Sequence, residues 1–367
     1  MKRHRRVRAI TCTRVRADPR RWIAACCALL VACAWYCHPV PARAADGEVE
    51  RASSFDRRAD VQAFIAEMAR SEGFDRVALA GVFAQVRSQP RVIAAMSRPI
   101  ATPPKWYEYG PQFLNPSRID AGVAFWRAND AALARAQSEF GVPAEVIVAI
   151  IGVETYYGRN TGSYRVIDAL STLAFDYPRR AEYFTGELRN FLLLCREQSV
   201  SPLAARGSFA GAVGLPQFMP GSIRNYAVDY DGDGRIDLAN NPDDAVGSVA
   251  NYLSRHGWQT GQPVMTQVRL EDARTDELVR LFDGGVAERR PVAAWVRDGV
   301  TGFVIPGDLG SDPVGLLMLE SHDAPEYWMT FTNWFVLTRY NRSRLYASSV
   351  WLLAQALKTA SESAIAR

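Results

Sequence analysis

The stretch VIVAIIGVETYYG, residues 146–158, places one glutamate in the most apolar run of the chain beyond residue 45. Ile147, Ile150, Ile151 and Glu154 follow one another at i, i+3, i+4 and i+7. In an α-helix, side chains at this spacing lie on one face. The sequence therefore predicts a buried helix whose apolar face carries a carboxyl group.

The ends of this helix are marked by Pro143 and Gly158. Proline is tolerated in the first turn of a helix and glycine is common just after the last turn, so we expect the helix to open at Pro143 and to stop at Gly158. Burial disfavours the ionised form of a carboxyl group, so the pKa of Glu154 should be raised, as suits a general acid near neutral pH. The alternative is a structural glutamate that an arginine or backbone donors satisfy.

The rest of the pattern is mostly helical. Apolar residues recur at helical spacing in residues 61–68, 79–83, 119–140 and 346–357, and Ser343 is available to cap the last of these. After about residue 260 come three short apolar or β-branched runs, VMTQVRL (264–270), GFVIP (302–306) and VGLLMLE (314–320). The predicted fold class is mainly α (α+β), with a small strand-rich subdomain.

Composition divides the chain into five parts. These are a leader at 1–44, an N-terminal helical segment at 45–104 ending in the stiff connector PIATPP, a central helical core at 105–260, a small β subdomain at 261–330, and a C-terminal helical segment at 331–367 that is expected to pack back on the helical domain.

The leader has the layout of an export signal. A basic region precedes an apolar core at residues 22–37, and Ala42, Arg43 and Ala44 form a small-x-small cleavage site. Residues 30–33, LVAC, resemble the lipobox of bacterial lipoproteins, which would leave Cys33 as a lipidated N-terminus held at the outer membrane. We therefore expect a periplasmic protein, either soluble or lipid-anchored; a single N-terminal membrane anchor is the third alternative.

Charge and cysteine content exclude several function classes. The net charge is +4, but the leader holds ten of the 43 basic residues and one of the 39 acidic ones, so the remaining 33 basic and 38 acidic residues give about −5. This argues against a basic surface for nucleic acid. Five of the six cysteines lie in the leader, so Cys195 is expected to be a small core residue. Only His256 and His322 follow the leader, which disfavours cysteine-nucleophile and histidine–zinc chemistry.

Two segments downstream of Glu154 have the composition of a sugar site. The segment FDYPRRAEYF (175–184) is rich in aromatic and basic residues, and GSFAGAVGLPQFMPGS (207–222) contains four glycines, which let the backbone approach a ligand closely. Taken alone, the second segment is an ordinary loop and Arg179 and Arg180 are a solvated surface pair.

Four motifs in order, GVETYYG, STLAFDYPRRAEYF, GSFAGAVGLPQFMPGS and AVGSVANYLSRHGW, resemble the lytic murein transglycosylase B family over roughly residues 55–360. The resemblance implies a lysozyme-like core in residues 105–260, flanked by a helical domain and a small β domain. It also implies cleavage of the β-1,4 bond between N-acetylmuramic acid and N-acetylglucosamine in peptidoglycan, with Glu154 as the catalytic acid and base. The residues expected to line the glycan groove are Ser208, Gln217, Arg179, Arg180, Tyr183, Tyr109, Tyr252, Tyr340, Asn341 and Tyr346.

A single carboxyl group is compatible with this chemistry. Most glycosidases use two, but an N-acetyl sugar can stabilise its own anomeric centre through the acetamido oxygen. Asp168 and Asp176 are candidates for a second acid only if the fold brings them close to Glu154. The resemblance implies a 1,6-anhydro product. The alternatives are a muramidase that hydrolyses the same bond and a non-catalytic, calcium-dependent module that binds the wall. No organic cofactor is expected.

Residues 229–240, DYDGDGRIDLAN, match an EF-hand loop with one departure, Asn240 in place of the final bidentate glutamate. Asp243 or Asp244 could substitute for it. Alternatively, Asn241 caps the next helix, Pro242 opens it, and the two acids complement its N-terminus. The sequence predicts a structural Ca²⁺ site, against the alternative of an Asp/Gly turn that binds nothing. The predicted ligands are Asp229, Asp231, Asp233, the carbonyl of Arg235, Asp237 and Asn240.

Overall fold

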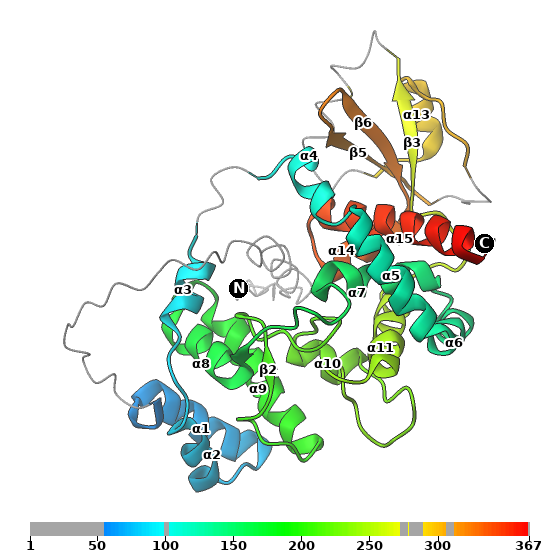
Figure 1. The fold of residues 1–367 in the computed structure, drawn as a ribbon. Helices are drawn as coiled ribbons and strands as arrows, with labels where there is room; N and C mark the ends of the chain where they lie inside the picture. Colours follow the sequence, from blue (N-terminus) through cyan, green and yellow to red (C-terminus); the bar gives the residue numbers. More distant parts are fainter. Residues whose placement is uncertain (1–54, 99–102, 272–277, 279–288, 306–311, 366–367) are drawn as a thin grey trace, which may run out of the picture.

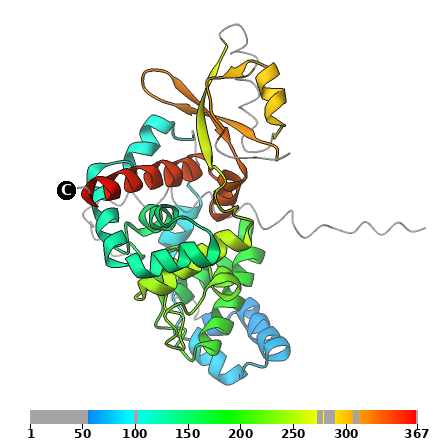
Figure 2. The ribbon, with the colours of Figure 1, turned by 90° about the vertical axis from the view of Figure 1, so that its right-hand side faces the viewer.

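The computed structural model describes residues 55–98, 103–271, 278, 289–305 and 312–365. The expected export signal, its cleavage site and Cys33 lie outside the described residues. In two perpendicular views, the N-terminal helices are at one end of the molecule and a small sheet is at the other, with a helical body between them (Figures 1 and 2).

The N-terminal helices pack on the helices that follow the glutamate stretch. A buried cluster joins Phe64, Met68 and Phe83 to Leu173 and Phe191. Residues 166–219 thus share a core with the segment before residue 98. The elements around this core are η3 (Phe55–Arg57), α1 (Ala59–Glu72), α2 (Arg76–Phe83), α3 (Pro90–Met96), α8 (Val166–Asp176), η5 (Pro178–Arg180) and α9 (Ala181–Glu197). The thiol of Cys195 is buried in this cluster, as predicted, and burial raises its pKa to about 12.

The central body is built around α7 (Ala144–Thr155). Eleven of its twelve residues are buried, and Glu154 is the exception. Helix α15 (Arg344–Ile365) packs along α7 with the predicted stripe of Tyr346, Val350, Leu353 and Leu357, all fully buried. The surrounding elements are α4 (Trp106–Tyr109), η4 (Gly110–Gln112), α5 (Pro116–Ala128), α6 (Asp130–Phe140), α10 (Pro220–Tyr226), α11 (Pro242–Arg255) and α14 (Thr332–Tyr340).

Within the described ranges, no individual helix combines the length and the apolar composition needed to cross a bilayer. Helices α6 and α7, which meet at 115°, reach that length and composition only when they are taken together.

The small subdomain is an antiparallel sheet with its own core. The strand order is β4 (Val300–Thr301), β3 (Met265–Leu270), β6 (Pro325–Thr330), β5 (Gly315–Glu320), and the short helix α13 (Val292–Arg297) packs with it. The predicted strands at 264–270 and 314–320 are present. The prediction of a strand at GFVIP is wrong for the described residues 302–305, because Gly302 has φ +70° and ends the strand after Thr301.

Two predicted helix boundaries also differ. The predicted helix over 119–140 is two helices, because the Asn129 side chain donates to the Phe125 carbonyl and its backbone leaves the helical region. Helix α7 ends at Thr155 rather than Gly158, because Tyr156 and Tyr157 have φ values of 53° and 59°. Tyr156 forms a left-handed cap whose N–H bonds to the Gly152 carbonyl.

Packing explains this early end of α7. The Tyr157 ring fills a notch between α5 and α7 that exists because Gly122 and Gly152 have no side chain; a Cβ atom there would lie 2.3 Å and 2.6 Å from the Tyr157 hydroxyl oxygen. The buried Arg118 guanidinium donates to the Gly152 carbonyl and covers the Tyr156 ring at 4.5 Å. The chain therefore turns sharply two residues after Glu154, at Tyr156.

The burial of α7 predicts that Ile150→Ala lowers the free energy of unfolding by about 2–5 kcal/mol, because it leaves a cavity beneath α15. Val77→Ala is the control: Val77 is 82% exposed on α2, and its loss should change stability by no more than about 0.5 kcal/mol. Denaturant unfolding of both variants measures the difference. Equal effects would contradict the placement of α7 at the centre of the core.

Candidate active site

Glu154 is held at the C-terminal end of α7, half-buried, with its carboxyl group against α15. The Tyr346 hydroxyl of α15 donates to Glu154 Oε1 at 2.7 Å. Burial raises the pKa of Glu154 to about 7, and the hydrogen bond from Tyr346 opposes that rise because it stabilises the carboxylate. The carboxyl group can therefore exist in both protonation states near neutral pH, which is what a group that first gives and then takes a proton requires.

Four of the predicted groove residues form a wall of aromatic rings beside Glu154. Tyr346 stacks on Tyr340, with ring centroids 6.3 Å apart, and Tyr340 meets Tyr252 edge-on at 4.9 Å. Burial is the main cause of the raised pKa of Tyr109, and the charge of Glu154 raises it further. Tyr109 therefore also lies close to the carboxyl group. Asn341 is buried between α14 and α15, where its side-chain oxygen accepts from the Ser343 N–H.

Hydrogen bonds connect the loop at residues 207–222 to both α7 and α14. Thr155, the residue after Glu154, donates its hydroxyl to the Leu215 carbonyl at 2.9 Å, and Tyr340 donates to the Pro216 carbonyl at 2.5 Å. Gln217 has a left-handed backbone, and its amide donates to Thr161 and Gly214 carbonyls. The Ser208 hydroxyl accepts from the N–H groups of Ala210 and Ala212. The loop conformation is thus fixed by the residues that the sequence predicted as glycan contacts.

The remaining predicted contacts lie on η5 and α9. The Arg180 guanidinium lies 4.8 Å from the Tyr183 ring, and Arg179 is exposed. Tyr183 hydrogen-bonds to Glu187, a residue that the sequence reasoning missed. Glu187 also accepts from the Gly221 N–H at 2.8 Å, and burial raises its pKa. The i, i+4 spacing of Tyr183 and Glu187 on one helix is the signal that could have linked them.

The two candidates for a second acid are engaged elsewhere. Asp168 accepts from the Arg165 guanidinium at 2.8 Å and 2.9 Å, and Asp176 pairs with Arg58 at 2.5 Å. Both therefore stabilise the junction with the N-terminal helices. Burial and Tyr346 are the causes of the pKa shift of Glu154, and no second carboxylate among the described residues contributes to it.

The acidic loop brings together three carboxylates. One oxygen each of Asp229, Asp231 and Asp244 lies within 4.8 Å of the other two. Asp244 is fully buried, its oxygens accept from the N–H groups of Tyr230 and Asp237 at 2.7 Å, and burial and the charges of Asp231 and Asp229 raise its pKa. Three clustered carboxylates with hard oxygen atoms suit a divalent cation such as Ca²⁺.

The other predicted metal ligands are arranged differently. Asp233 and Asp237 lie outside this group of carboxylates; Asp233 accepts from the Arg235 N–H, and the Asn240 amide donates to Asp237 at 2.9 Å. The helix-capping explanation for the residues after the loop is confirmed. Asn241 caps α11 by accepting from the N–H groups of Asp243 and Asp244, Pro242 opens that helix, and Asp244 also joins the carboxylate group.

The raised pKa of Glu154 predicts a pH-dependent cost to stability. The folded state holds the proton up to about pH 7, whereas the unfolded chain releases it near pH 4.5. The free energy of unfolding should therefore fall between pH 4.5 and 7 and stay lowered above pH 7. Glu154→Gln should remove this loss and be more stable than wild type by on the order of 1–3 kcal/mol at pH 8, with no gain below pH 4.5.

Thermal unfolding from pH 4 to pH 8 measures this difference. Glu362→Gln is the matched control, because Glu362 is exposed on α15. A difference between Glu154→Gln and wild type that is the same at every pH would show that the carboxyl group has an ordinary environment.

Comparison with known proteins supports the family resemblance that the four sequence motifs indicated. Residues 56–355 match the family described as "Transglycosylase SLT domain". The chain is 39% identical over 327 residues to membrane-bound lytic murein transglycosylase B of Escherichia coli (strain K12), covering 85% of this chain and 86% of that protein.

Two solved structures have the same fold. Soluble lytic transglycosylase SltB1 from Pseudomonas aeruginosa is 45% identical with a TM-score of 0.76, covering 82% of this chain and 99% of that chain. Escherichia coli lytic transglycosylase Slt35 in complex with calcium is 40% identical with a TM-score of 0.75, covering 83% of this chain and 94% of that chain. The mainly helical fold predicted from the sequence is thereby confirmed. The chain therefore belongs to the transglycosylase SLT domain family, as the four sequence motifs implied, and is a lytic transglycosylase.

Proposed function

We propose that the protein cleaves the β-1,4 bond between N-acetylmuramic acid and N-acetylglucosamine in peptidoglycan and leaves 1,6-anhydro-muramic ends, with Glu154 as the sole acid and base. The observation that carries this proposal is the half-buried carboxyl group with a pKa of about 7. The names of the relatives support the substrate, since the E. coli protein is a murein transglycosylase.

The protonated Glu154 donates its proton to the glycosidic oxygen as the bond from that oxygen to the anomeric carbon breaks. The 2-acetamido oxygen of muramic acid stabilises the anomeric carbon, which replaces the second carboxylate of most glycosidases. The carboxylate of Glu154 then takes the proton from the muramic acid 6-hydroxyl, whose oxygen bonds to the anomeric carbon. Glu154 ends protonated, as it began, and no water is consumed.

The surroundings of Glu154 favour this outcome over hydrolysis. The wall of tyrosine rings and the apolar end of α7 limit water around the carboxyl group, and the 6-hydroxyl reacts within the same sugar ring. The structure of SltB3 from Pseudomonas aeruginosa in complex with NAG-anhNAM-pentapeptide supports an anhydro product here as well; that protein is 33% identical with a TM-score of 0.74, covering 84% of this chain and 80% of that chain.

The same proposal includes the compartment in which the enzyme acts, which the leader indicates. Cleavage after Ala44 would give a soluble protein, and lipidation of Cys33 would hold it at the outer membrane; both routes deliver the enzyme to the periplasm and the wall. The E. coli relative, which is named membrane-bound, supports a membrane-anchored form.

Digestion of purified sacculi tests the reaction. Wild-type protein should release fragments with anhydro-muramic ends, which mass spectrometry finds one water lighter than reducing ends. Glu154→Gln should lower the rate by at least about 10²-fold, because the general acid is lost. Glu362→Gln should act like wild type. Reducing ends would identify a hydrolytic muramidase, and an undiminished rate in Glu154→Gln would contradict the role of Glu154.

The proposal includes a structural Ca²⁺ held by Asp229, Asp231 and Asp244, and the E. coli Slt35 structure in complex with calcium supports it. Calcium should raise the melting temperature of wild type, because an ion that binds only the folded state stabilises it. Asp244→Asn should abolish the calcium-induced rise, whereas Asp243→Asn, one residue away and outside the carboxylate group, should keep it. The same rise in Asp244→Asn as in wild type would exclude Asp244 as a ligand.

A further inference from the structure

The small sheet meets the central body at the end of the β5–β6 hairpin. This hairpin lies over α4 in two perpendicular views, and β5 contacts that helix (Figures 1 and 2). Leu317 and Leu319 of β5 belong to the same buried cluster as Tyr109 and Tyr346, the two tyrosines that lie close to Glu154. The small sheet and the surroundings of the acid therefore share one core.

Glu320, the last residue of β5, links this strand to α4 and α15. Its Oε1 accepts from the Lys105 ammonium at 3.4 Å, and its Oε2 lies 3.6 Å from the Arg344 guanidinium. Lys105 is the N-cap residue of α4, four positions before Tyr109. Arg344 is the first residue of α15, two positions before Tyr346. One carboxylate thus holds the starts of both helices that carry these tyrosines.

The carboxylate of Glu320 differs from a solvated surface group. Its Oε2 is buried and accepts no hydrogen bond from the described residues, so the nearby Arg344 guanidinium is its main compensation. Withdrawing a charged oxygen from water is costly unless a partner of opposite charge is present. The Arg344 side chain also donates to the Met318 carbonyl at 3.4 Å. Glu320 and Arg344 therefore restrict each other's position.

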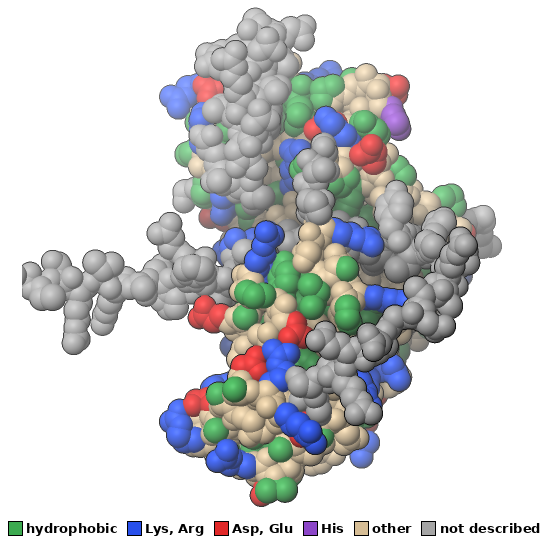
Figure 3. All heavy atoms as spheres, turned by 90° about the vertical axis from the view of Figure 1, so that its left-hand side faces the viewer, with side chains coloured by type: hydrophobic (Ala, Val, Ile, Leu, Met, Phe, Trp, Pro, Cys, Tyr) green, Lys and Arg blue, Asp and Glu red, His purple; other side chains and the backbone are tan. Residues whose placement is uncertain are grey.

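A second contact joins the hairpin to α4. The ring of His322, in the turn between β5 and β6, packs on the Tyr107 ring with centroids 4.4 Å apart and planes at 32°. Figure 3 shows acidic, basic and histidine side chains close together at this end of the molecule. The hairpin thus contacts α4 at Lys105 and at Tyr107, just before Tyr109 in the same helix.

We propose that Glu320 is a positioning residue for the active site, through which the small sheet holds the starts of α4 and α15. The tyrosines of these helices then stay packed around Glu154. Among the described residues, the titratable groups that interact with Glu154 are Tyr346, through its hydrogen bond, and Tyr109, through the charge of the carboxylate. The proposal rests on the proposed function for the catalytic role of Glu154 and adds a function for the small sheet.

Carbon-13 NMR titration of Glu154 tests the proposal with two substitutions of opposite charge. Glu320→Gln, which is isosteric and should keep the fold, and Arg344→Gln should each lower the midpoint by on the order of 1 pH unit, because water reaches the carboxyl group. Loss of the Arg344 charge by itself would instead raise the midpoint, since a cation favours the carboxylate. A fall in both variants therefore separates positioning from direct electrostatics. Arg344→Lys, which keeps the charge, should stay close to wild type.

The pH dependence of the rate gives a second measurement. If the midpoint falls by about 1 unit from about 7, the protonated fraction of Glu154 at pH 7 falls from about a half to about a tenth. The rate of sacculus digestion by Glu320→Gln should therefore fall about 5-fold at pH 7 and change little at pH 5. A purely structural loss would lower the rate by the same factor at both pH values.

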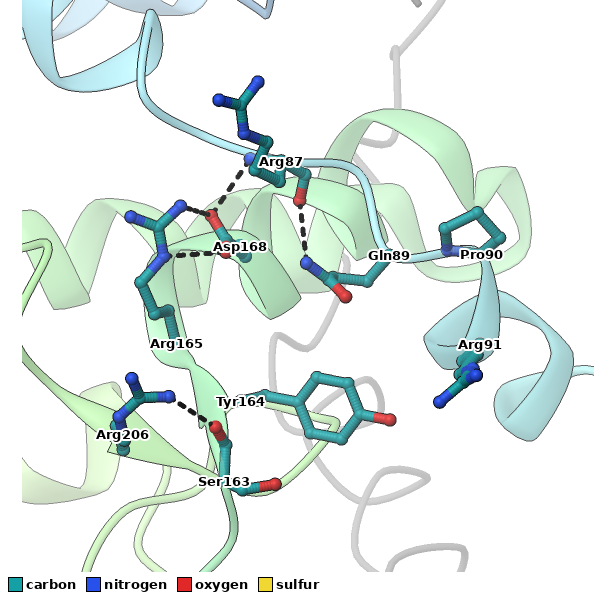
Figure 4. A pocket seen from close by; sticks show the side chains of 9 residues that line it. All are labelled: Arg87, Gln89, Pro90, Arg91, Ser163, Tyr164, Arg165, Asp168 and Arg206. Carbon is teal, nitrogen blue, oxygen red and sulfur yellow. Dashed lines mark hydrogen bonds and ion pairs between the residues drawn. The ribbon is translucent and has the colours of Figure 1, made fainter. Parts of the chain in front are cut away.

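The junction of the N-terminal helices supplies the matched control for the arginine substitution. It lies beside a cavity between α3, α8 and the two-stranded ribbon of β1 (Tyr164–Arg165) and β2 (Arg206–Gly207), and there Arg165 donates to Asp168 at 2.8 Å and 2.9 Å (Figure 4). The residues that line this cavity include neither the catalytic glutamate nor its hydrogen-bond partner. Arg165→Gln should therefore leave the midpoint of the catalytic glutamate unchanged.

Asp298→Asn is the control for Glu320→Gln, because Asp298 pairs with Arg290 at 3.1 Å within the small subdomain. It should also keep the wild-type midpoint. A midpoint that Glu320→Gln leaves near 7, or a rise in Arg344→Gln, would overturn the proposal. So would a fall of equal size in the two controls, which would show a general loosening of the fold. Failure of the proposed function would instead appear as wild-type protein that leaves sacculi uncut, whatever the midpoint of Glu154.

Discussion

The hydrogen bond between Tyr346 and Glu154 joins two helices through residues that are 192 positions apart in sequence, and the active site depends on it. Helix α7 presents a carboxyl group at the end of an apolar face, and only α15 brings a fully buried partner to that group. Without this cover, Glu154 would be hydrated and would have an ordinary pKa. The packing of α15 on α7 therefore stabilises the fold and sets the acidity of the catalytic group.

A second constraint is the sharp turn that follows Glu154. Gly122 and Gly152 leave the notch that receives Tyr157, and the left-handed conformations of Tyr156 and Tyr157 turn the chain away from α7. This turn leads the chain to the ribbon beside Ser208, while Thr155 bonds to the loop that contains Gln217. The acid and the loop are thus positioned by one short segment.

Patterns in the sequence predicted those structural features that depend on residues close to one another along the chain. The burial of the α7 face, the stripe on α15, the cap at Asn241 and the small sheet all follow from spacing and composition. The sequence did not reveal that Tyr157 would end α7 three residues early, because that depends on glycines of two different helices. Nor could it place Asp168 and Asp176, whose arginine partners decide their roles.

The pKa of Glu154 is the quantity on which the proposed chemistry depends most directly. Carbon-13 NMR titration of the glutamate side-chain carboxyl groups measures it, with Glu154→Gln assigning the signal. A midpoint near pH 7 is expected, moving higher in Tyr346→Phe because the carboxylate loses its hydrogen bond. A midpoint near 4.5 that Tyr346→Phe leaves unchanged would show a solvated carboxylate and contradict its role as the acid.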